Sequence, residues 1–421
     1  MKLSRLAERT PPSGILAISN AVKQRAGAGE QLLNYTVGDF NPQLFPIPRL
    51  LEDEIVKAYR NRQTNYPATD GNEDLRVAIA AFVKKHQALC YNPSEIMIGS
   101  GGRPLLFAAY HMIVDPGDTV IYPVPSWNNH FYVQLTGAIP RVIATEPGNN
   151  FMPTAEEIRP FIKEAVLLAL CSPQNPTGTC FRAAQLKAIC EMVVEENTRR
   201  GSEEKKLYIF YDQIYYLLHY GREQHISPVS VCPEVQPYTI YVDAISKAFA
   251  ATGVRVGWCY GPEPVIGKIK TMLNHVGAWA PMAEQKAVAA FLNNDSAVTV
   301  YLNGFKEALL QRLTTIYKGI LHMKMKGLPI DAIAPEASIY LSVKIALPQD
   351  MTTVLLEEAG IALLPFRVFG AAHAPYWYRL SVGTCRMEDM APMLRGLQRV
   401  LEAHMQPVKE HRVAAGSKTP E

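Results

Sequence analysis

A lysine and an arginine stand close together just after an apolar stretch of the chain. Residues 238–245 are rich in β-branched and aromatic side chains, which predicts a strand, and Lys247 follows directly. Apolar shielding at a strand end lowers the pKa of a lysine, so that its amine can form a Schiff base. Arg255 stands between Gly253 and Gly257, and its planar fork of donors suits a phosphate. A lysine taken alone is more often a solvated surface charge, so the other elements must decide.

Five predicted strands each end next to a distinctive polar or aromatic residue. The strand ends and the residues that follow them are Gly99 with Ser100, Tyr122 with Trp127, Cys171 with Asn175, Tyr211 with Asp212, and Ile245 with Lys247. Strands that alternate with helices form a mainly parallel sheet, and such sheets bind ligands outside their carboxyl ends. The sequence therefore predicts one site, assembled from five strand ends.

A glycine loop precedes one of the predicted helices. Ser100, Gly101, Gly102 and Arg103 lie between a strand over 95–99 and a helix over 105–114, with Pro104 in its first position. Free backbone N–H groups at a helix start bind anions. A glycine pair is common in plain turns, so the placement between strand and helix carries the prediction.

Composition excludes several classes of protein. The 421 residues include 48% hydrophobic and 19% charged residues with a net charge of +3, which is ordinary for a globular enzyme. No basic block indicates nucleic-acid binding, and no apolar run approaches the ~18 residues of a membrane span. The N-terminus lacks the apolar core of a secretory signal. The seven cysteines are scattered without a Cys-x-x-Cys pair, so we expect reduced thiols, a cytoplasmic location and no metal site.

The length predicts two domains. We expect long helices over 262–275 and 281–325, broken at Ala280-Pro281, before a strand and helix pattern restarts near residue 327. The predicted division is an N-terminal arm with part of the small domain over 1–45, a large domain over 46–285, a small C-terminal domain over 286–405, and a polar tail over 406–421.

The pattern Ser246-Lys247, Gly253, Arg255, Gly257 resembles the active-site lysine segment of fold-type I pyridoxal-phosphate enzymes. Within these enzymes the chain is most similar to class I/II aminotransferases of the aspartate aminotransferase type, over about residues 30–400. The resemblance implies an α/β fold, with a mainly parallel sheet between helices in a large domain and a smaller α/β domain. Two departures are Ala244, where the family often has a phosphate-binding serine, and Pro365-Phe366 in place of Pro-Gly.

The resemblance implies pyridoxal 5'-phosphate as cofactor, bound as a Schiff base to Lys247, which also moves the substrate's α-proton. Asp212 would keep the ring nitrogen protonated, Trp127 would stack on the ring, and Asn175 and Tyr215 would bind its phenolic oxygen. The implied phosphate-binding residues are Ser100, Gly101, Gly102, Arg103, Ser246, Arg255 and, from a second copy, Tyr66. A homodimer with shared active sites follows from Tyr66, although a tyrosine in that place can simply pack.

The same resemblance assigns the substrates, an α-amino acid and a 2-oxo acid. Arg379 would clamp the α-carboxylate, with Gly38 beside it and Asn175 and Trp127 also near the substrate. Arg103 falls where some members that use acidic substrates have a lysine for the distal carboxylate. Arg103 and Trp127 together favour aspartate or glutamate, while a phosphate role for Arg103 stays open.

Several alternatives share these motifs. An aromatic amino-acid aminotransferase, or a lyase, decarboxylase or cyclopropane-forming synthase of the same fold, needs no visibly different cofactor residues. A regulatory module that binds the cofactor usually has a DNA-binding domain in front, for which we expect about thirty arm residues to leave no room. An inactive scaffold is disfavoured because Lys247 and Asp212 are both present.

Overall fold

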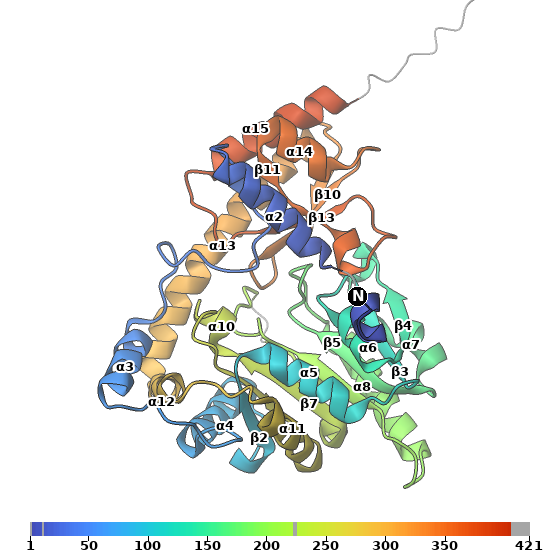
Figure 1. Ribbon diagram of the computed structural model, residues 1–421. Coiled ribbons are helices and arrows are strands. Elements are labelled where there is room, and N and C mark those ends of the chain that lie inside the picture. The colour runs from blue at the N-terminus through green and yellow to red at the C-terminus, as the bar shows by residue number, and fades with distance from the viewer. Residues whose placement is uncertain (1, 11, 222–224, 406–421) are drawn as a thin grey trace, which may run out of the picture.

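The computed structural model describes residues 2–10, 12–221 and 225–405, so the predicted polar tail over 406–421 lies outside the described residues. Figure 1 shows a broad lower part that contains the large sheet and a narrower upper part built from C-terminal elements and α2 (Gly14–Gly27). Helix α13 (Asp295–Met325) runs from the lower part to the upper part. The two parts enclose the site described below.

Within the described residues, seven strands form the large sheet in the order β2-β8-β7-β6-β5-β3-β4. Their bounds are β2 (Ile96–Gly99), β3 (Thr119–Val124), β4 (Ile139–Ala144), β5 (Ala165–Cys171), β6 (Tyr208–Asp212), β7 (Thr239–Ala244) and β8 (Gly257–Tyr260). Strands β3 to β7 run parallel, and β8 pairs antiparallel with both β2 and β7. The prediction of a mainly parallel sheet is confirmed.

Helices cover both faces of this sheet. One face packs against α5 (Gly102–Ile113), α6 (Asn129–Thr136) and α11 (Glu263–Val276). The other packs against α4 (Glu73–Gln87), α8 (Ala183–Arg199), α9 (Pro228–Val231) and α12 (Met282–Leu292), and α3 (Arg49–Arg60) lies against α12. In β5, Leu168 and Leu170 belong to one core while Leu167 and Ala169 belong to the other. This explains the continuous apolar run, because a strand covered on both faces has no solvated side.

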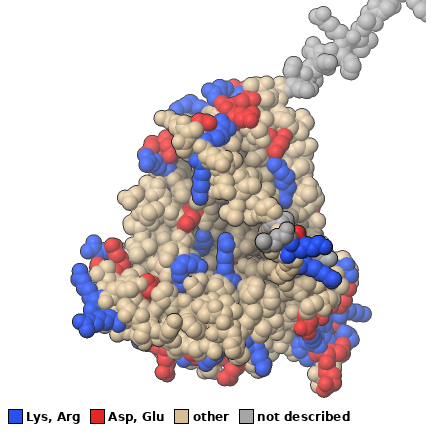
Figure 2. Space-filling model, viewed as in Figure 1, with Lys and Arg blue, Asp and Glu red and all other residues tan. Residues whose placement is uncertain are grey.

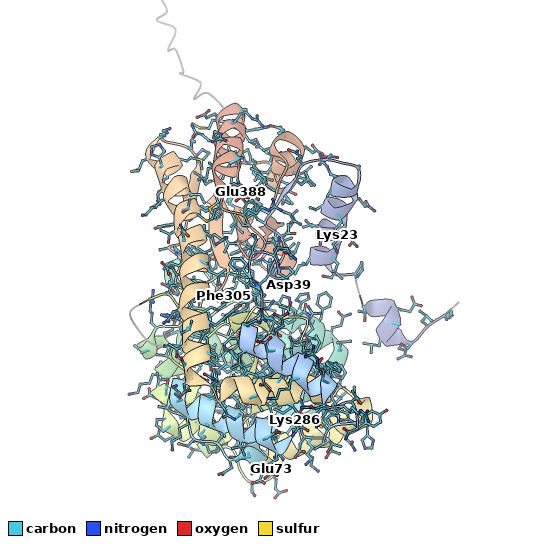
Figure 3. All side chains as sticks on the ribbon, turned by 90° about the vertical axis from the view of Figure 1, so that its left-hand side faces the viewer. Lys23, Asp39, Glu73, Lys286, Phe305 and Glu388 are labelled. Carbon is cyan, nitrogen blue, oxygen red and sulfur yellow. The ribbon has the colours of Figure 1, made fainter. Side chains whose placement is uncertain are left out.

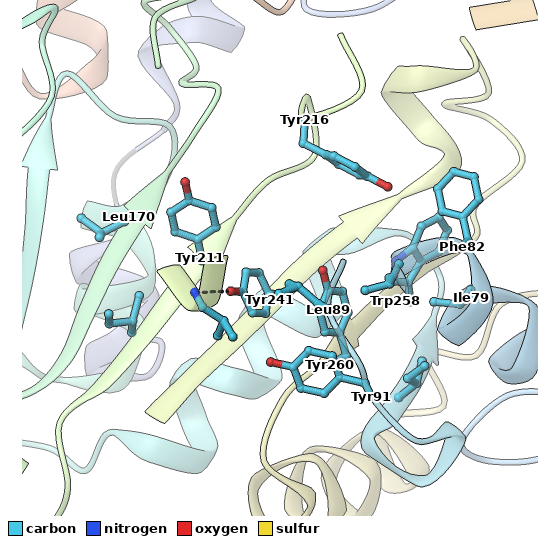
Figure 4. Close-up of a cluster of buried hydrophobic side chains, with 14 of the residues drawn as sticks. Ile79, Phe82, Leu89, Tyr91, Leu170, Tyr211, Tyr216, Tyr241, Trp258 and Tyr260 are labelled. Carbon is cyan, nitrogen blue, oxygen red and sulfur yellow. Dashed lines mark hydrogen bonds between the residues drawn. The ribbon is translucent and has the colours of Figure 1, made fainter. Parts of the chain in front are cut away.

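A group of aromatic rings packs between strands of the large sheet and the helices on one of its faces (Figure 4). The Tyr241 and Tyr260 rings stack at 4.8 Å, and the Tyr211 ring meets Tyr241 edge-on at 5.8 Å. The Tyr241 hydroxyl accepts a hydrogen bond of 3.1 Å from the Val229 amide, which satisfies its buried polar end. These rings lie on β6, β7 and β8, so they fix the strands that lead to Asp212 and Lys247.

The upper part contains a second sheet, antiparallel and in the order β12-β13-β10-β9. Its strands are β9 (Ile330–Ala332), β10 (Tyr340–Ile345), β12 (Leu364–Pro365) and β13 (Trp377–Ser381), packed with α13, α14 (Met351–Ala359) and α15 (Met390–His404). The N-terminal β1 (Leu33–Asn34) pairs in parallel with β11 (Ile361–Ala362), after α1 (Arg5–Arg9) and α2. The segment that follows α2 therefore lies beside an element of the C-terminal part of the chain.

Two expected elements differ from the structure. The helix over 281–325 is two helices, because Asn294 caps α13 by accepting a hydrogen bond from the Ala297 amide. Helix α5 begins at Gly102, so Pro104 is its third residue and not its first. A proline there loses no helical hydrogen bond, because the first N–H groups of a helix have no helical partner.

The large-sheet core continues past residue 285, since α12 and the first turns of α13 pack into it. The boundary at 285/286 stays a prediction. In the described ranges, no helix is both long and apolar enough to cross a bilayer.

Candidate active site

A cavity of about 510 Å³ lies between the two parts, outside the carboxyl ends of the parallel strands. Figure 2 shows basic side chains gathered at a hollow near the middle of this face. The predicted site residues that line the cavity are Gly38, Gly102, Arg103, Trp127, Asn175, Asp212, Tyr215, Ser246, Lys247, Arg255 and Arg379. The structure thus brings together residues that are dispersed over most of the chain.

Lys247 enters the cavity from a short helix, α10 (Ile245–Ala248), that follows β7 directly. Its Nζ donates a hydrogen bond of 2.6 Å to the Gly38 carbonyl oxygen. Burial lowers the pKa of the Lys247 amine to about 8; Asp39 opposes this effect, and Arg379, the next contributor, adds to it. A larger fraction of this amine is therefore neutral and nucleophilic near pH 7 than in an exposed lysine.

Asp212 is the last residue of β6 and also lines the cavity. Burial raises the pKa of its carboxyl to about 6, while a hydrogen bond of 3.1 Å from the Ile214 amide and the charge of Lys247 oppose the shift. A bound cation would stabilise the ionised carboxylate. Asp212 can therefore pair with a protonated ring nitrogen.

Arg255 joins two loops at the other end of the cavity. It has a positive φ of 59°, and its guanidinium donates 2.7 Å and 3.0 Å hydrogen bonds to the carbonyl oxygens of Thr252 and Ser100. A Cβ atom on Gly101 would lie 1.9 Å from Arg255 Nη2, and one on Gly257 would lie 2.5 Å from the Gly101 carbonyl carbon. Glycine at both positions lets the loops touch. Ser100 and Gly101 thus lie beside Arg255, next to the cavity.

Arg379 on β13 is 3% exposed and faces the lysine from the upper part. Its Nη1 donates a 2.9 Å hydrogen bond to Asn175 Oδ1, and its Nη2 donates a 2.6 Å hydrogen bond to the Thr36 carbonyl oxygen. Its Nε has no partner among the described residues. Since a guanidinium has five N–H donors, Arg379 retains donors for a carboxylate.

One aromatic pair and one cation–π pair complete the walls. The Tyr215 and Tyr340 hydroxyl oxygens lie 2.6 Å apart, and the Tyr340 ring lies 4.5 Å from the Arg379 guanidinium carbon. On the open side, the exposed Arg103 guanidinium lies 4.6 Å from the centre of the Trp127 ring. In the described part of the chain, Arg103 forms no ion pair with an acidic side chain. Arg103 is thus a cation at the entrance.

Tyr66 does not line this cavity. Its side chain is 81% exposed and lies 5.4 Å from Trp279 in a separate surface hollow that also includes Tyr59 and Glu284. Its predicted role would require a second copy of the chain and stays a prediction.

Several residues that line the cavity had no role predicted from the sequence. They are Ile15, Leu16 and Ser19 of α2, and Thr36, Val37, Asp39, Leu106, Ile214, Val242, Thr252 and Tyr340. Asp39 and Thr252 stand inside the Gly38 and Lys247 motifs, so a search for polar neighbours of these motifs could have found them. No local signal marks Ile15 or Leu16, which reach the cavity only through the path of the N-terminal arm.

Comparison with known proteins identifies the family of the chain. The family model for aminotransferase class I and II matches residues 31–397. The aspartate aminotransferase of Geobacillus stearothermophilus is 28% identical, with 96% of this chain and 100% of the relative covered. The aspartate/prephenate aminotransferase of Thermus thermophilus is 29% identical, with 95% and 98% covered.

A solved structure of Thermus thermophilus aspartate aminotransferase with maleate superimposes with a TM-score of 0.85. It is 27% identical, with 95% of this chain and 100% of that chain covered. These similarities confirm the predicted fold type and enzyme class. The chain belongs to the class I and II aminotransferases.

Proposed function

We propose that this aminotransferase uses pyridoxal 5'-phosphate to move the amino group of aspartate or glutamate to a 2-oxo acid. The observation that carries the proposal is the placement of Lys247, with a pKa of about 8, in one cavity with the two-donor fork of Arg379. A nucleophilic amine and a carboxylate clamp are the two groups that an amino-acid substrate requires.

The cavity residues fit the cofactor. The start of α5, Ser246 and Arg255 line the cavity and offer donors for a phosphate. Asp212 would face the ring nitrogen, and Trp127 would offer a flat surface to the ring. Because Asn175 accepts from Arg379 through its oxygen, its NH₂ group remains to donate to the phenolic oxygen, with Tyr215 nearby.

When bound, pyridoxal phosphate supplies an electron sink for the substrate's α-carbon. Lys247 Nζ would hold the cofactor, and the free Lys247 amine would move the proton from the substrate's α-carbon. Arg379 fixes the α-carboxylate beside Gly38 and thereby aligns the α C–H bond. Tyr340 and Phe369 cover the Arg379 guanidinium, which excludes water from the clamp.

Arg103 supports the acidic substrate. It is a cation at the entrance, held on the Trp127 ring, and no acidic side chain in the described residues neutralises it. A side-chain carboxylate of the substrate would supply that missing charge. The relatives named as aspartate aminotransferases agree with this choice.

We also propose a homodimer in which the exposed Tyr66 completes the phosphate site of the second copy. The hollow around Tyr66 and Trp279 is a suitable contact surface because it combines exposed aromatic rings with polar groups. Sedimentation of the full chain would measure the number of copies. Tyr66→Phe should weaken cofactor binding, whereas the matched Tyr59→Phe, in the same hollow, should not. All seven cysteines are free, in keeping with the proposed cytoplasmic location.

A half-reaction tests the main proposal. The cofactor-loaded protein is mixed with one amino acid and no oxo acid, and the released cofactor and oxo acid are measured by chromatography. We expect aspartate or glutamate to yield one 2-oxo acid and one pyridoxamine phosphate per site, and Lys247→Ala to yield neither. Conversion by aromatic amino acids alone would contradict the acidic preference. Product release without amination of the cofactor would instead favour a lyase or decarboxylase.

A further inference from the structure

The segment 36–39 touches three functional groups at once. The Thr36 carbonyl oxygen accepts from Arg379 Nη2 at 2.6 Å, and the Gly38 carbonyl oxygen accepts from Lys247 Nζ at 2.6 Å. Asp39 Oδ1 accepts from the Thr252 hydroxyl at 2.7 Å. One short segment therefore connects the carboxylate clamp, the lysine and the loop that bears Arg255.

Asp39 is the anchored end of this segment. Its Oδ1 also accepts a 2.8 Å hydrogen bond from the Phe40 amide. A Cβ atom on Gly383 would lie 2.1 Å from the Asp39 carbonyl oxygen, so the backbone here packs directly against the strand end after Arg379. Figure 3 shows Asp39 where the chain crosses between the upper and lower parts, near Phe305 of α13. The hydrogen bond from Thr252 thus fixes the segment 36–39 to the lower part.

The charges around Lys247 are unequal. Two negatively charged groups act on it, Asp39 and Asp212. Three positively charged groups also act on it, Arg103, Arg255 and Arg379. Tyr215 and Tyr340 also border the cavity, but burial raises the pKa of both hydroxyls, so they are neutral. Asp212 is the group that would face the ring nitrogen. Asp39 is then the carboxylate left to offset the three arginines at the lysine.

We propose that Asp39 is a positioning residue, which holds the Gly38 carbonyl against Lys247 through Thr252 and supplies negative charge to the lysine. This inference rests on the proposed function for its catalytic meaning. Its effects on the hydrogen bond and the protonation of Lys247 do not depend on the cofactor. Without the Thr252 anchor, the Gly38 carbonyl would no longer be held at Lys247 Nζ, and without the carboxylate the lysine would lose its proton more readily.

Two substitutions separate the charge from the anchor. Asp39→Asn removes the charge but retains an oxygen that can accept from Thr252. Thr252→Val removes the hydroxyl but retains the shape and the charge of Asp39. Thr252→Ser restores the hydroxyl, and Thr271→Val is a matched control because its hydroxyl bonds only within the exposed face of α11.

The first readout needs neither cofactor nor substrate. The full chain, freed of cofactor, is treated with acetic anhydride at a series of pH values, and acetylation of Lys247 is followed by peptide mass spectrometry. Lys268, an exposed lysine on α11, is the internal reference. We expect Asp39→Asn to move the midpoint for Lys247 down by about half a pH unit or more, since an opposite charge nearby favours the protonated amine. A midpoint equal to that of the parent would overturn the charge role.

The second readout is the half-reaction with aspartate. We expect Thr252→Val to lower the maximal rate of this single turnover at least several-fold, with little change in the aspartate concentration that gives half of that rate. We expect Thr252→Ser and Thr271→Val to behave as the parent. A parental maximal rate in Thr252→Val would overturn the anchoring role. A parent that converts no amino acid would contradict the proposed function and leave the acetylation result standing as a separate test of Asp39.

Discussion

A methyl group added at Gly38 would intrude on the carboxylate clamp. In Gly38→Ala, the Cβ atom would lie 2.8 Å from Tyr340 Oη, and 3.7 Å and 3.8 Å from Arg379 Nη1 and Nη2. A carboxylate bound to these nitrogens needs its oxygens at about 2.7–2.9 Å from them, so the methyl group and the carboxylate compete for space. Loss of one hydrogen bond to a charged group costs about 1.5–3 kcal/mol. We therefore expect the KM for aspartate to rise about 10- to 150-fold.

The assay is the concentration dependence of the half-reaction rate in the cofactor-loaded protein. Gly253→Ala is the matched control, because a Cβ atom there meets nothing within 4 Å. If crowding of the Tyr340 hydroxyl contributes, Tyr340→Phe should relieve part of the loss in the double variant. An unchanged KM in a fully loaded Gly38→Ala protein would refute the placement of the substrate carboxylate beside Gly38.

Three further predictions concern charged residues of the cavity. Arg379→Lys should raise the KM for every amino acid by about 10-fold or more, because an ammonium cannot form the two-donor fork, and a loss confined to acidic substrates would contradict the clamp. Arg103→Gln should slow the half-reaction with aspartate about 10-fold and spare alanine, whereas equal losses would move Arg103 to the cofactor. Lys247→Met should be more stable than the parent at pH 7 in the cofactor-free protein. Folded Lys247 releases its proton near pH 8 and an unfolded lysine near 10.5. The parent therefore gains stability as the pH rises from 8 to 10.5, and urea unfolding should show that the stability difference between Lys247→Met and the parent shrinks over this range. A difference that does not vary with pH would contradict the lowered pKa.

Elements with a strong local pattern were predictable. The strand that was expected to end at Cys171 does end there, because burial on both sides of a sheet requires a continuous apolar run. The break between α12 and α13 was missed, although Asn294 is a typical capping residue. Four polar residues, 293–296, also interrupt the apolar spacing at this break.

The site was predictable where its residues follow strand ends. Asn175, Asp212 and Lys247 each stand in a local motif, and the parallel sheet brings the motifs together. The contacts of Tyr340 and Asp39 were not predictable in this way. The hydroxyl pair of Tyr215 and Tyr340 joins positions 125 residues apart, and the bond from Thr252 to Asp39 joins positions 213 apart. Such pairs depend on how the two parts of the molecule meet, which no short stretch of sequence encodes.

The pairing of β1 with β11 has a consequence for synthesis. All seven strands of the large sheet lie between Ile96 and Tyr260, so this sheet can form while the ribosome is still adding the rest of the chain. Leu33 cannot pair until Ile361 has been synthesised, and the Thr36 carbonyl cannot accept its hydrogen bond until Arg379 has been synthesised. The N-terminal segment, although made first, is therefore among the last to find its place. A nascent chain that stalls before β13 would already contain the strands of the large sheet but would lack Arg379, the proposed carboxylate-binding residue.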